Sequence, residues 1–296
     1  MSRDEPDVEM EAAAEGADRP LEAGLYLVAT PIGNLADLGR RARAVLAAAD
    51  RVACEDTRVT GRLLRHLGLD KPLLAYHEHN AEKRRPALLA ELSRGARVAL
   101  VSDAGTPLVS DPGYKLVRAA RDAGIAVHPI PGPSAVLAAL TASGLPTDRF
   151  FFQGFVPAKA GARARVVAEL APLAATLVFF ESAGRAAETL DALAAGLGAR
   201  EAVLARELTK RFEEFRRGTL AELAQRCRDA PPRGEVVLVV AGATRAASAM
   251  DDGAIDAALR DALAEHGPSE AARLVAQRSG RPRRALYARA LELQGR

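Results

Sequence analysis

The sequence predicts an α/β protein, made of two successive α/β units and a small helical appendage. From Leu25 to Ala241, short apolar runs with strand character alternate with longer segments whose apolar residues recur at helical spacing. After Asp252 only helical patterns follow. This alternation is typical of mostly parallel sheets with crossover helices, whose ligands collect at the carboxyl ends of the strands.

The first unit opens with the strand-like LYLVAT, which leads through a turn into the helical pattern RRARAVLAAAD. Turn residues then separate four more short apolar runs. We expect these strands at 51–54, 73–76, 98–101 and 126–129. We expect the intervening helices at 58–67, 81–93 and 114–123.

The second unit repeats the alternation after the helix VLAALTASG. Its strands are expected at 150–152, 176–180, 201–205 and 235–241, and its helices at 162–170, 186–197 and 220–227. Gly242–Asp252 has the composition of a linker. The predicted domains are an acidic disordered tail (1–23), two α/β domains (24–130 and 131–243) and a basic helical appendage (253–296).

Composition narrows the functional classes. The chain of 296 residues is 49% hydrophobic, yet its apolar runs are far shorter than the roughly 20 residues of a membrane span. Two cysteines without metal-ligand spacing fit a reducing compartment, so we expect a cytoplasmic protein. Charge is uneven: residues 1–23 carry about −6 and residues 271–296 about +6, which favours an anionic partner for the C-terminal end.

Three turns rich in glycine and proline follow apolar strands: TPIGN (30–34), SDAGTP (102–107) and PGPSA (131–135). Glycine lets the backbone approach a ligand and proline fixes the chain, so such turns build rigid concave surfaces. A single turn of this kind is as readily a tight connection, but three favour a site for a small polar cofactor. The sequence contains neither G-x-G-x-x-G after the first strand nor a P-loop motif.

Longer motifs carry a resemblance. Six motifs, in their order along the chain, closely resemble the ribosomal RNA small subunit methyltransferase I family, and the resemblance covers residues 24–296. The motifs are LYLVATPIGNLADLGRRA, VACEDTRVTGRLL, VALVSDAGTPLVSDPGYKLV, IPGPSAVLAALTASGLPTDRFFFQGFVP, TLVFFES and ARELTKRFEEFRRGTL. That family has the tetrapyrrole-methylase fold. The resemblance implies 2′-O-methylation of a decoding-centre cytidine of 16S rRNA, with S-adenosylmethionine bound between two α/β domains of a homodimer.

The same resemblance implies which residues contact the cofactor. They follow the strands of both units. The implied residues are Pro31, Ile32 and Gly33; Ser102, Asp103, Ala104, Gly105 and Thr106; Pro131, Gly132, Pro133 and Ser134; and Phe180 and Glu181. Leu238–Gly242 matches a final strand end. TPIGN replaces a glycine-rich loop of the porphyrin-modifying relatives.

A ribose hydroxyl needs a nearby base, or a cation beside the developing oxyanion. ACEDTR places Glu55, Asp56 and Arg58 at the start of a helix, where they are either substrate-facing groups or helix caps. Lys210 is a further catalytic candidate. Asp111, before Pro112, is expected to be an Asx-turn residue.

The stretch ARELTK is either a solvated charged face or, as the resemblance implies, part of the substrate region. In that second case Arg206, Glu207 and Thr209 contact the substrate. YHEHN (76–80) holds two histidines, too few ligands for a metal, so we expect no metal.

The C-terminal pattern predicts a helix from Pro268 to Gly280, then a second helix after Pro282. Six arginines within 17 residues are either a solubilising surface or a phosphate-binding one, and Arg281, Arg283 and Arg284 are our candidates for RNA contacts. Expected partners are therefore 16S rRNA, within the small ribosomal subunit, and a second copy of the chain. Two alternatives stay open: a tetrapyrrole-type methylase of the same fold, and a non-catalytic RNA-binding protein.

Overall fold

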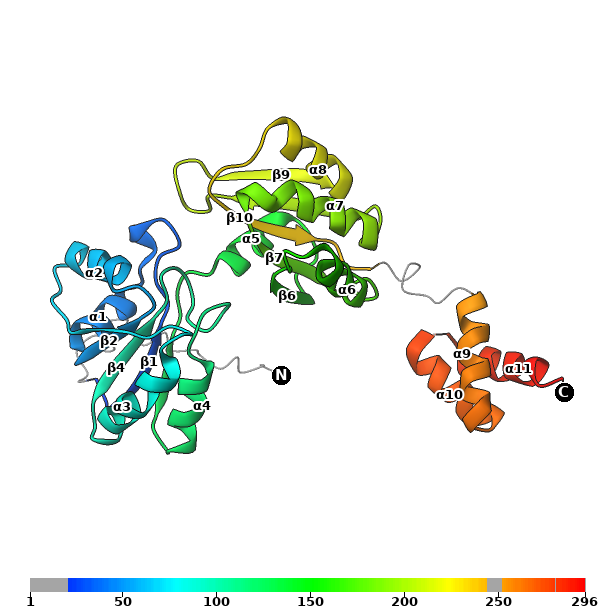
Figure 1. Cartoon of the computed structure of the whole chain (residues 1–296), viewed down its shortest axis with the longest axis horizontal. Coiled ribbons are helices and arrows are strands. Elements are labelled where there is room, and N and C mark those ends of the chain that lie inside the picture. Colours follow the sequence, from blue (N-terminus) through cyan, green and yellow to red (C-terminus); the bar gives the residue numbers. More distant parts are fainter. Residues whose placement is uncertain (1–20, 244–251, 280, 296) are drawn as a thin grey trace, which may run out of the picture. The chain divides into compact units, whose positions relative to one another are not determined.

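The computed structural model describes residues 21–243, 252–279 and 281–295, so most of the expected acidic tail and linker lies outside the described residues. The chain divides into two compact units (Figure 1). The first runs to Ala138 and takes in Glu207–Glu214; the second holds Ala139–Arg206 and the chain from Phe215 onward. The domain limits expected from the sequence stay predictions.

The first unit is built on a parallel five-stranded sheet in the order β3-β2-β4-β1-β5. Its strands are β1 (Gly24–Val28), β2 (Arg51–Cys54), β3 (Leu73–Ala75), β4 (Arg97–Val101) and β5 (Val127–Ile130). Leu27 of β1 lies between Leu100 of β4 and Pro129 of β5. The α/β class and the parallel sheet predicted for this unit are confirmed.

Helices cover both faces of this sheet. They are α1 (Arg40–Ala48), α2 (Thr57–His66), α3 (Ala81–Ser93) and α4 (Tyr114–Asp122). Because successive strand residues face opposite ways, Tyr26 packs with Leu46 and Leu64 of α1 and α2, whereas Leu25 packs with Leu88 and Leu116 of α3 and α4. Burial on both faces explains why these strands have no polar alternation. The carboxyl ends of all five strands meet at one edge.

The second unit contains a mixed sheet in the order β6-β7-β10-β8-β9. Its strands are β6 (Phe150–Phe155), β7 (Thr176–Ser182), β8 (Glu201–Arg206), β9 (Glu214–Thr219) and β10 (Glu235–Val240). Helices α5 (Ala135–Ser143), α6 (Ala160–Leu170), α7 (Ala186–Leu197) and α8 (Leu220–Asp229) complete the α/β pattern. The sequence analysis missed β9, because EFRRGT is a charged strand at the edge of the sheet.

Strand direction places the two strand ends expected to contact the cofactor in the second unit at opposite edges of its sheet. β10 runs antiparallel to β7, with Glu235 opposite Ser182 and Val240 opposite Leu177. The carboxyl end of β10 therefore lies beside the amino end of β7. Gly242 is packed against that end: a Cβ on it would lie 2.6 Å from the backbone nitrogen of Ala175. Leu238–Gly242 therefore lies at the opposite edge of this sheet from Phe180, and its expected cofactor contact stays a prediction.

The C-terminal helices pack on one another around their own small core. They are α9 (Asp252–Glu265), α10 (Pro268–Ser279) and α11 (Arg283–Leu293). Leu259, Val275 and Leu286 contribute one buried side chain from each helix. The predicted helical appendage is confirmed, although the helix end expected at Gly280 lies outside the described residues.

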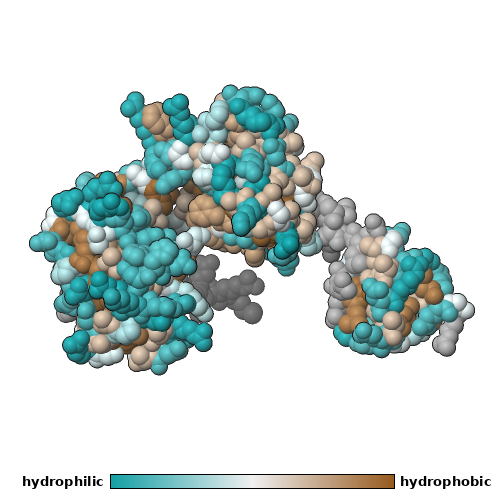
Figure 2. Space-filling model, in the orientation of Figure 1, coloured by the Kyte–Doolittle hydropathy of each residue, from teal (hydrophilic) through white to brown (hydrophobic). Residues whose placement is uncertain are grey.

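Polar side chains dominate the face of the molecule seen in Figure 2, with apolar atoms in small groups between them. Within the described ranges, no helix combines the length and apolar character needed to cross a membrane.

Candidate active site

Hydrogen bonds join the first two of the glycine-rich turns into one surface at the carboxyl edge of the first sheet. The backbone groups of Thr30 and Gly105 exchange hydrogen bonds of 2.9 and 3.0 Å. The Thr30 hydroxyl donates to the carbonyl of Ser102 at 3.1 Å, and the Ser102 hydroxyl donates to the carbonyl of Gly105 at 3.0 Å. The bonds made by Thr30 span more than 70 residues of the chain and hold the exits of β1 and β4 in a fixed relation.

The third turn is attached to the same surface. The Thr106 hydroxyl donates to the carbonyl of Pro133 at 3.2 Å. Gly105 has φ +83°, a conformation that favours glycine, and a Cβ on it would lie 3.4 Å from the side chain of Ile32. A Cβ on Gly132 would lie 3.0 Å from that of Ala29. The three turns thus form one closely fitted backbone surface.

Carboxylates gather at the exits of β2 and β4. Burial, and then the charge of Asp103, raise the pKa of Glu55. Burial and the charge of Glu55 raise the pKa of Asp111 to about 6, although a hydrogen bond with Ser102 acts to lower it. Asp111 therefore faces this cluster, a role that its expected Asx turn did not include. The loop that carries it is strained, with positive φ at Leu108 (+73°) and Ser110 (+63°).

Asp56 and Arg58 adopt the helix-capping arrangement. The Asp56 carboxylate accepts the backbone N–H of Arg58 at 2.7 Å, as the N-cap of α2, and pairs with the Arg58 guanidinium at 2.6 Å. The Arg58 guanidinium and backbone N–H lower the pKa of Asp56 to about 2. The charges of these two candidates are thus matched to each other, which leaves Glu55 as the more available carboxylate.

The segment Glu207–Glu214 brings Lys210 to the first unit. The methylene chain of Lys210 lies over Gly33 so closely that a Cβ on Gly33 would be 2.5 Å from the Lys210 Cγ. The Lys210 ammonium forms an ion pair of 3.0 Å with Glu207. Glu207 and Thr209 both have positive φ, so this turn is strained as well. Lys210 and the TPIGN turn, predicted from distant parts of the sequence, are therefore neighbours.

In the second unit, Glu181 is fully enclosed rather than open to a ligand. Its carboxylate accepts the Thr189 hydroxyl at 2.6 Å and the backbone N–H of Ser182 at 2.7 Å, and lies 3.5 Å from the Arg185 guanidinium. It thereby holds the turn after β7. Phe180 packs edge-on against Phe152 and Phe155 of β6, and the Arg206 guanidinium donates to the carbonyl of Arg233 at 3.3 Å.

The C-terminal arginines differ in how much of their charge is neutralised. Arg281 pairs with Asp252 at 3.0 Å, and Arg289 pairs with Asp256 and Glu292. The Arg283 guanidinium instead donates to the neutral hydroxyl of Ser269 at 2.9 Å. Arg284 is exposed and has no ion-pair partner in the part of the chain that the structure describes. The arginine count therefore overstates the free charge, which is concentrated at the start of α11.

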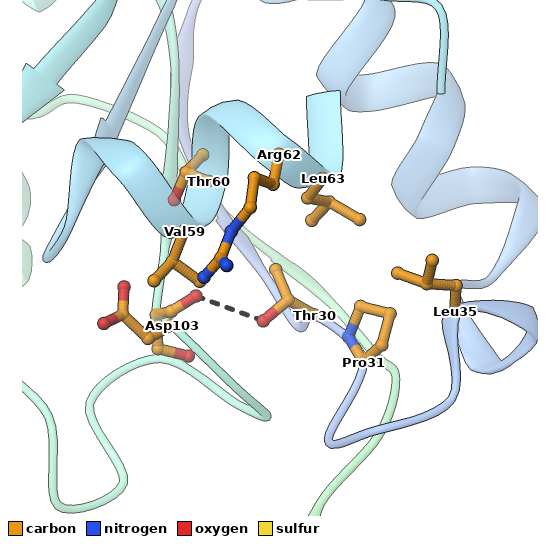
Figure 3. A pocket seen from close by; sticks show the side chains of 9 residues that line it. Thr30, Pro31, Leu35, Val59, Thr60, Arg62, Leu63 and Asp103 are labelled. Atoms are coloured by element: carbon orange, nitrogen blue, oxygen red, sulfur yellow. Dashed lines mark hydrogen bonds between the residues drawn. The ribbon is translucent and has the colours of Figure 1, made fainter. Parts of the chain in front are cut away.

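A hollow of about 210 Å³ opens beside the joined turns (Figure 3). Its walls come from the exits of β1 and β4 and from α2. The lining residues are Thr30, Pro31, Leu35, Val59, Thr60, Arg62, Leu63, Ser102 and Asp103. The sequence analysis missed Leu35, Val59, Thr60, Arg62 and Leu63. No sequence signal distinguished these residues from the other apolar and polar residues of the same segments.

The YHEHN segment has local partners. His77 contacts the Asn80 amide nitrogen through Nε2 at 3.0 Å, and its ring meets that of His79 edge-on. Across the described ranges, no cluster of three or more His, Cys, Asp or Glu side chains is placed to hold a metal ion.

Comparison with protein-family models gives two matches. The family described as Tetrapyrrole (Corrin/Porphyrin) Methylases matches residues 24–224, and the RsmI C-terminal HTH domain matches residues 249–294. Together the matched segments include every strand of the two sheets except β10, and all three C-terminal helices.

Sequence relatives agree with these matches. The chain is 55% identical to the Ribosomal RNA small subunit methyltransferase I of Mesorhizobium japonicum, over 93% of this chain and 94% of that protein. It is 47% identical to the protein of the same name from Escherichia coli O157:H7, over 92% of this chain and 96% of that protein. Among solved structures, the uroporphyrin-III C-methyl transferase of Thermus thermophilus, complexed with S-adenyl homocysteine, has a TM-score of 0.50 at 23% identity, covering 74% of this chain and 97% of that one.

Proposed function

This chain belongs to the tetrapyrrole methylases, S-adenosylmethionine-dependent methyltransferases, and within them to the ribosomal RNA small subunit methyltransferase I family; from this premise we propose that it methylates the ribose 2′-hydroxyl of a decoding-centre cytidine in 16S rRNA. The observation that carries the proposal is the 55% identity to a relative of that name over 93% of the chain. A chain with this substrate acts in the cytoplasm.

The joined turns are the proposed cofactor site. S-adenosylmethionine supplies a methyl group bonded to a positively charged sulfur. Pro31–Gly33, Ser102–Thr106 and Pro131–Ser134 offer it a rigid surface of peptide groups, which lowers the ordering cost of binding. The nearby carboxylates of Glu55, Asp103 and Asp111 favour a cation. Phe180 and Glu181, the further proposed cofactor contacts, belong to the second unit, where Glu181 holds the turn after β7.

Glu55 is the proposed base. The Glu55 carboxylate would take the proton of the ribose hydroxyl, while the bound cofactor would supply the methyl group and its sulfur would keep the electron pair of the broken carbon–sulfur bond. Its raised pKa suits this role, because a base works best with a pKa near the operating pH. Lys210, held by Glu207 beside Gly33, places a positive charge near the oxygen as it loses its proton. Asp56 and Arg58 fix the start of α2, next to Glu55.

The RNA is proposed to bind through Arg281, Arg283 and Arg284 of the helical appendage, and through Arg206, Glu207 and Thr209 near the site. We further propose a homodimer, and a domain division at residues 24–130, 131–243 and 253–296. The match of a dedicated C-terminal domain model supports an RNA substrate over a tetrapyrrole.

The test is methyl transfer to purified substrates. The protein is incubated with labelled S-adenosylmethionine and either small ribosomal subunits from a strain without this activity, naked 16S rRNA, or a porphyrin. The proposal expects label on the ribose of one cytidine, mapped by resistance of the next bond to alkaline hydrolysis. Label on the porphyrin alone would support the tetrapyrrole methylase, and label on none, with RNA binding intact, the non-catalytic protein.

A further inference from the structure

The hollow beside the joined turns lies on one side of the proposed cofactor surface. It is bounded by the exits of β1 and β4 and by α2, which follows β2 (Figure 3). In the strand order β3-β2-β4-β1-β5, β4 and β2 lie on one side of β1 and β5 lies on the other. Gly105 and Thr106, further along the loop after β4, and Pro131–Ser134, after β5, do not line the hollow. A methyl transfer needs two adjoining sites, and this arrangement provides a second one that shares only the Pro31 and Ser102–Asp103 wall.

The lining combines apolar walls with two separated charges. Pro31, Leu35, Val59 and Leu63 supply the apolar surface. The guanidinium of Arg62 extends across the hollow toward the Asp103 side in Figure 3, yet these two groups form no ion pair within 4.0 Å among the described residues. One Asp103 oxygen accepts the backbone N–H of Asp56 at 3.0 Å. A donor group and an acceptor group therefore both face the same space without satisfying each other.

This lining fits one class of ligand. We propose that the hollow receives the base of the target nucleotide, a cytosine turned out of its RNA; the inference rests on the proposed function. A pyrimidine has flat apolar faces and a polar edge. The cytosine amino group would donate to the Asp103 carboxylate, as carboxylates accept from that amine elsewhere, while Arg62 would donate to the ring nitrogen and carbonyl oxygen.

Size supports the same ligand. Pockets for drug-sized molecules usually span about 300–1,000 Å³, and this hollow has about 210 Å³. It accommodates a single base with part of its sugar, whereas a tetrapyrrole macrocycle exceeds it. A base enters such a space only after leaving its stack, as in other enzymes that act on extruded nucleotides.

The assignment also predicts selectivity. Uracil carries a carbonyl oxygen where cytosine carries the amino group, so it would place an acceptor against the Asp103 carboxylate. Polar sites discriminate between ligands in this way because a mismatched ligand leaves polar groups unpaired. We expect a target changed from cytidine to uridine to be methylated roughly 10- to 100-fold less efficiently.

The test compares two variants of the hollow with a matched control. Arg62→Gln removes the donor, and Leu35→Trp fills the rim from a position that is 46% exposed and so tolerates a larger side chain. Arg65→Gln is the control, since Arg65 is exposed on the same helix but does not line the hollow. Calorimetry with S-adenosylhomocysteine reports the fold and the cofactor site, and kcat/KM for small subunits reports the base site.

We expect unchanged S-adenosylhomocysteine affinity in all three proteins, a loss of about 10-fold or more in kcat/KM for Arg62→Gln and Leu35→Trp, and a control within about twofold of the parent. If both variants keep the parental kcat/KM, or if uridine is methylated as well as cytidine, the base site is overturned and the proposed function stands. If the parent transfers no methyl group to the subunit at all, both fall together.

Discussion

The methylene chain of Lys210 occupies the space that a side chain on Gly33 would need, with 2.5 Å between the Lys210 Cγ and a Cβ built on Gly33. The contact joins the TPIGN turn to a segment more than 170 residues later in the chain. It explains why glycine follows Pro31 and Ile32 here, and it positions the Lys210 ammonium beside its partner Glu207.

The first prediction concerns this contact. Gly33→Ala should displace Lys210 and lower the rate of methyl transfer by about 10-fold or more, because the cation no longer lies near the reacting oxygen. The free energy of unfolding should also fall, because φ at Gly33 is +159°, a value that L side chains rarely adopt. The control is Gly124→Ala, which also has a positive φ and where a Cβ meets nothing within 4 Å. Equal rates for the two variants would contradict a role for Lys210.

The second prediction concerns Gly105. Gly105→Ala and Gly124→Ala place alanine at similar positive φ angles, +83° and +71°. Each should cost about 1–2 kcal/mol of stability through backbone strain, measured by urea unfolding. Only Gly105→Ala should also weaken binding of S-adenosylhomocysteine, because its Cβ enters the contact with Ile32 and the Pro133 carbonyl, while that of Gly124 lies in open space. Calorimetry distinguishes the two, and parental affinity in Gly105→Ala would remove this turn from the cofactor site.

The strands of the two sheets differ in how well the sequence predicts them. Apolar runs with flanking turns were sufficient to predict all five strands of the first sheet, because a parallel sheet buried on both faces requires such runs. The charged edge strand β9 lacks this signal. Strand direction has no local signature either, so the antiparallel course of β10 could not be predicted from the pattern.

The candidate site shows the same division. The glycine and proline turns could be recognised from the sequence, because their backbone conformations require these residues. The structure joins them within one unit. Arg62 and Leu35 stood out in no motif, because the hollow that they line exists only once α2 packs beside the TPIGN turn. Asp111 was assigned to a turn from the proline that follows it, whereas the carboxylate that it faces, Glu55, is distant in sequence.

The third prediction follows from Asp111. Its pKa of about 6 in the folded protein exceeds the ordinary value of 3.8, so the folded state binds this proton more tightly than the unfolded chain. Ionisation of Asp111 therefore removes stability as the pH rises from about 4 to above 6. Asp111→Asn should be more stable than the parent at pH 8 and lose this advantage at pH 4, in urea unfolding at both values. A stability difference that does not vary with pH would contradict the burial of this charge.

The fourth prediction separates the arginines of the helical appendage. Arg283 and Arg284 begin α11 without an acidic partner among the described residues, whereas Arg273 pairs with Glu270 at 2.6 Å. If phosphates bind where charge is free, replacing Arg283 and Arg284 with glutamine should weaken RNA binding and lower the slope of log affinity against log salt by about 1–2.

The matched control for that experiment is Arg273→Gln, which removes one cation from a pair already neutralised and should change the salt slope by much less than 1. Because all these side chains lie in the helical appendage, affinity for S-adenosylhomocysteine should stay at the parental value in every variant. Titrations of small subunits at several salt concentrations provide the slopes. The prediction is contradicted if Arg273→Gln lowers the salt slope by as much as each arginine does in the double variant. That result would mean that RNA displaces the ion pairs, and that the free charge at the start of α11 has no special part in binding.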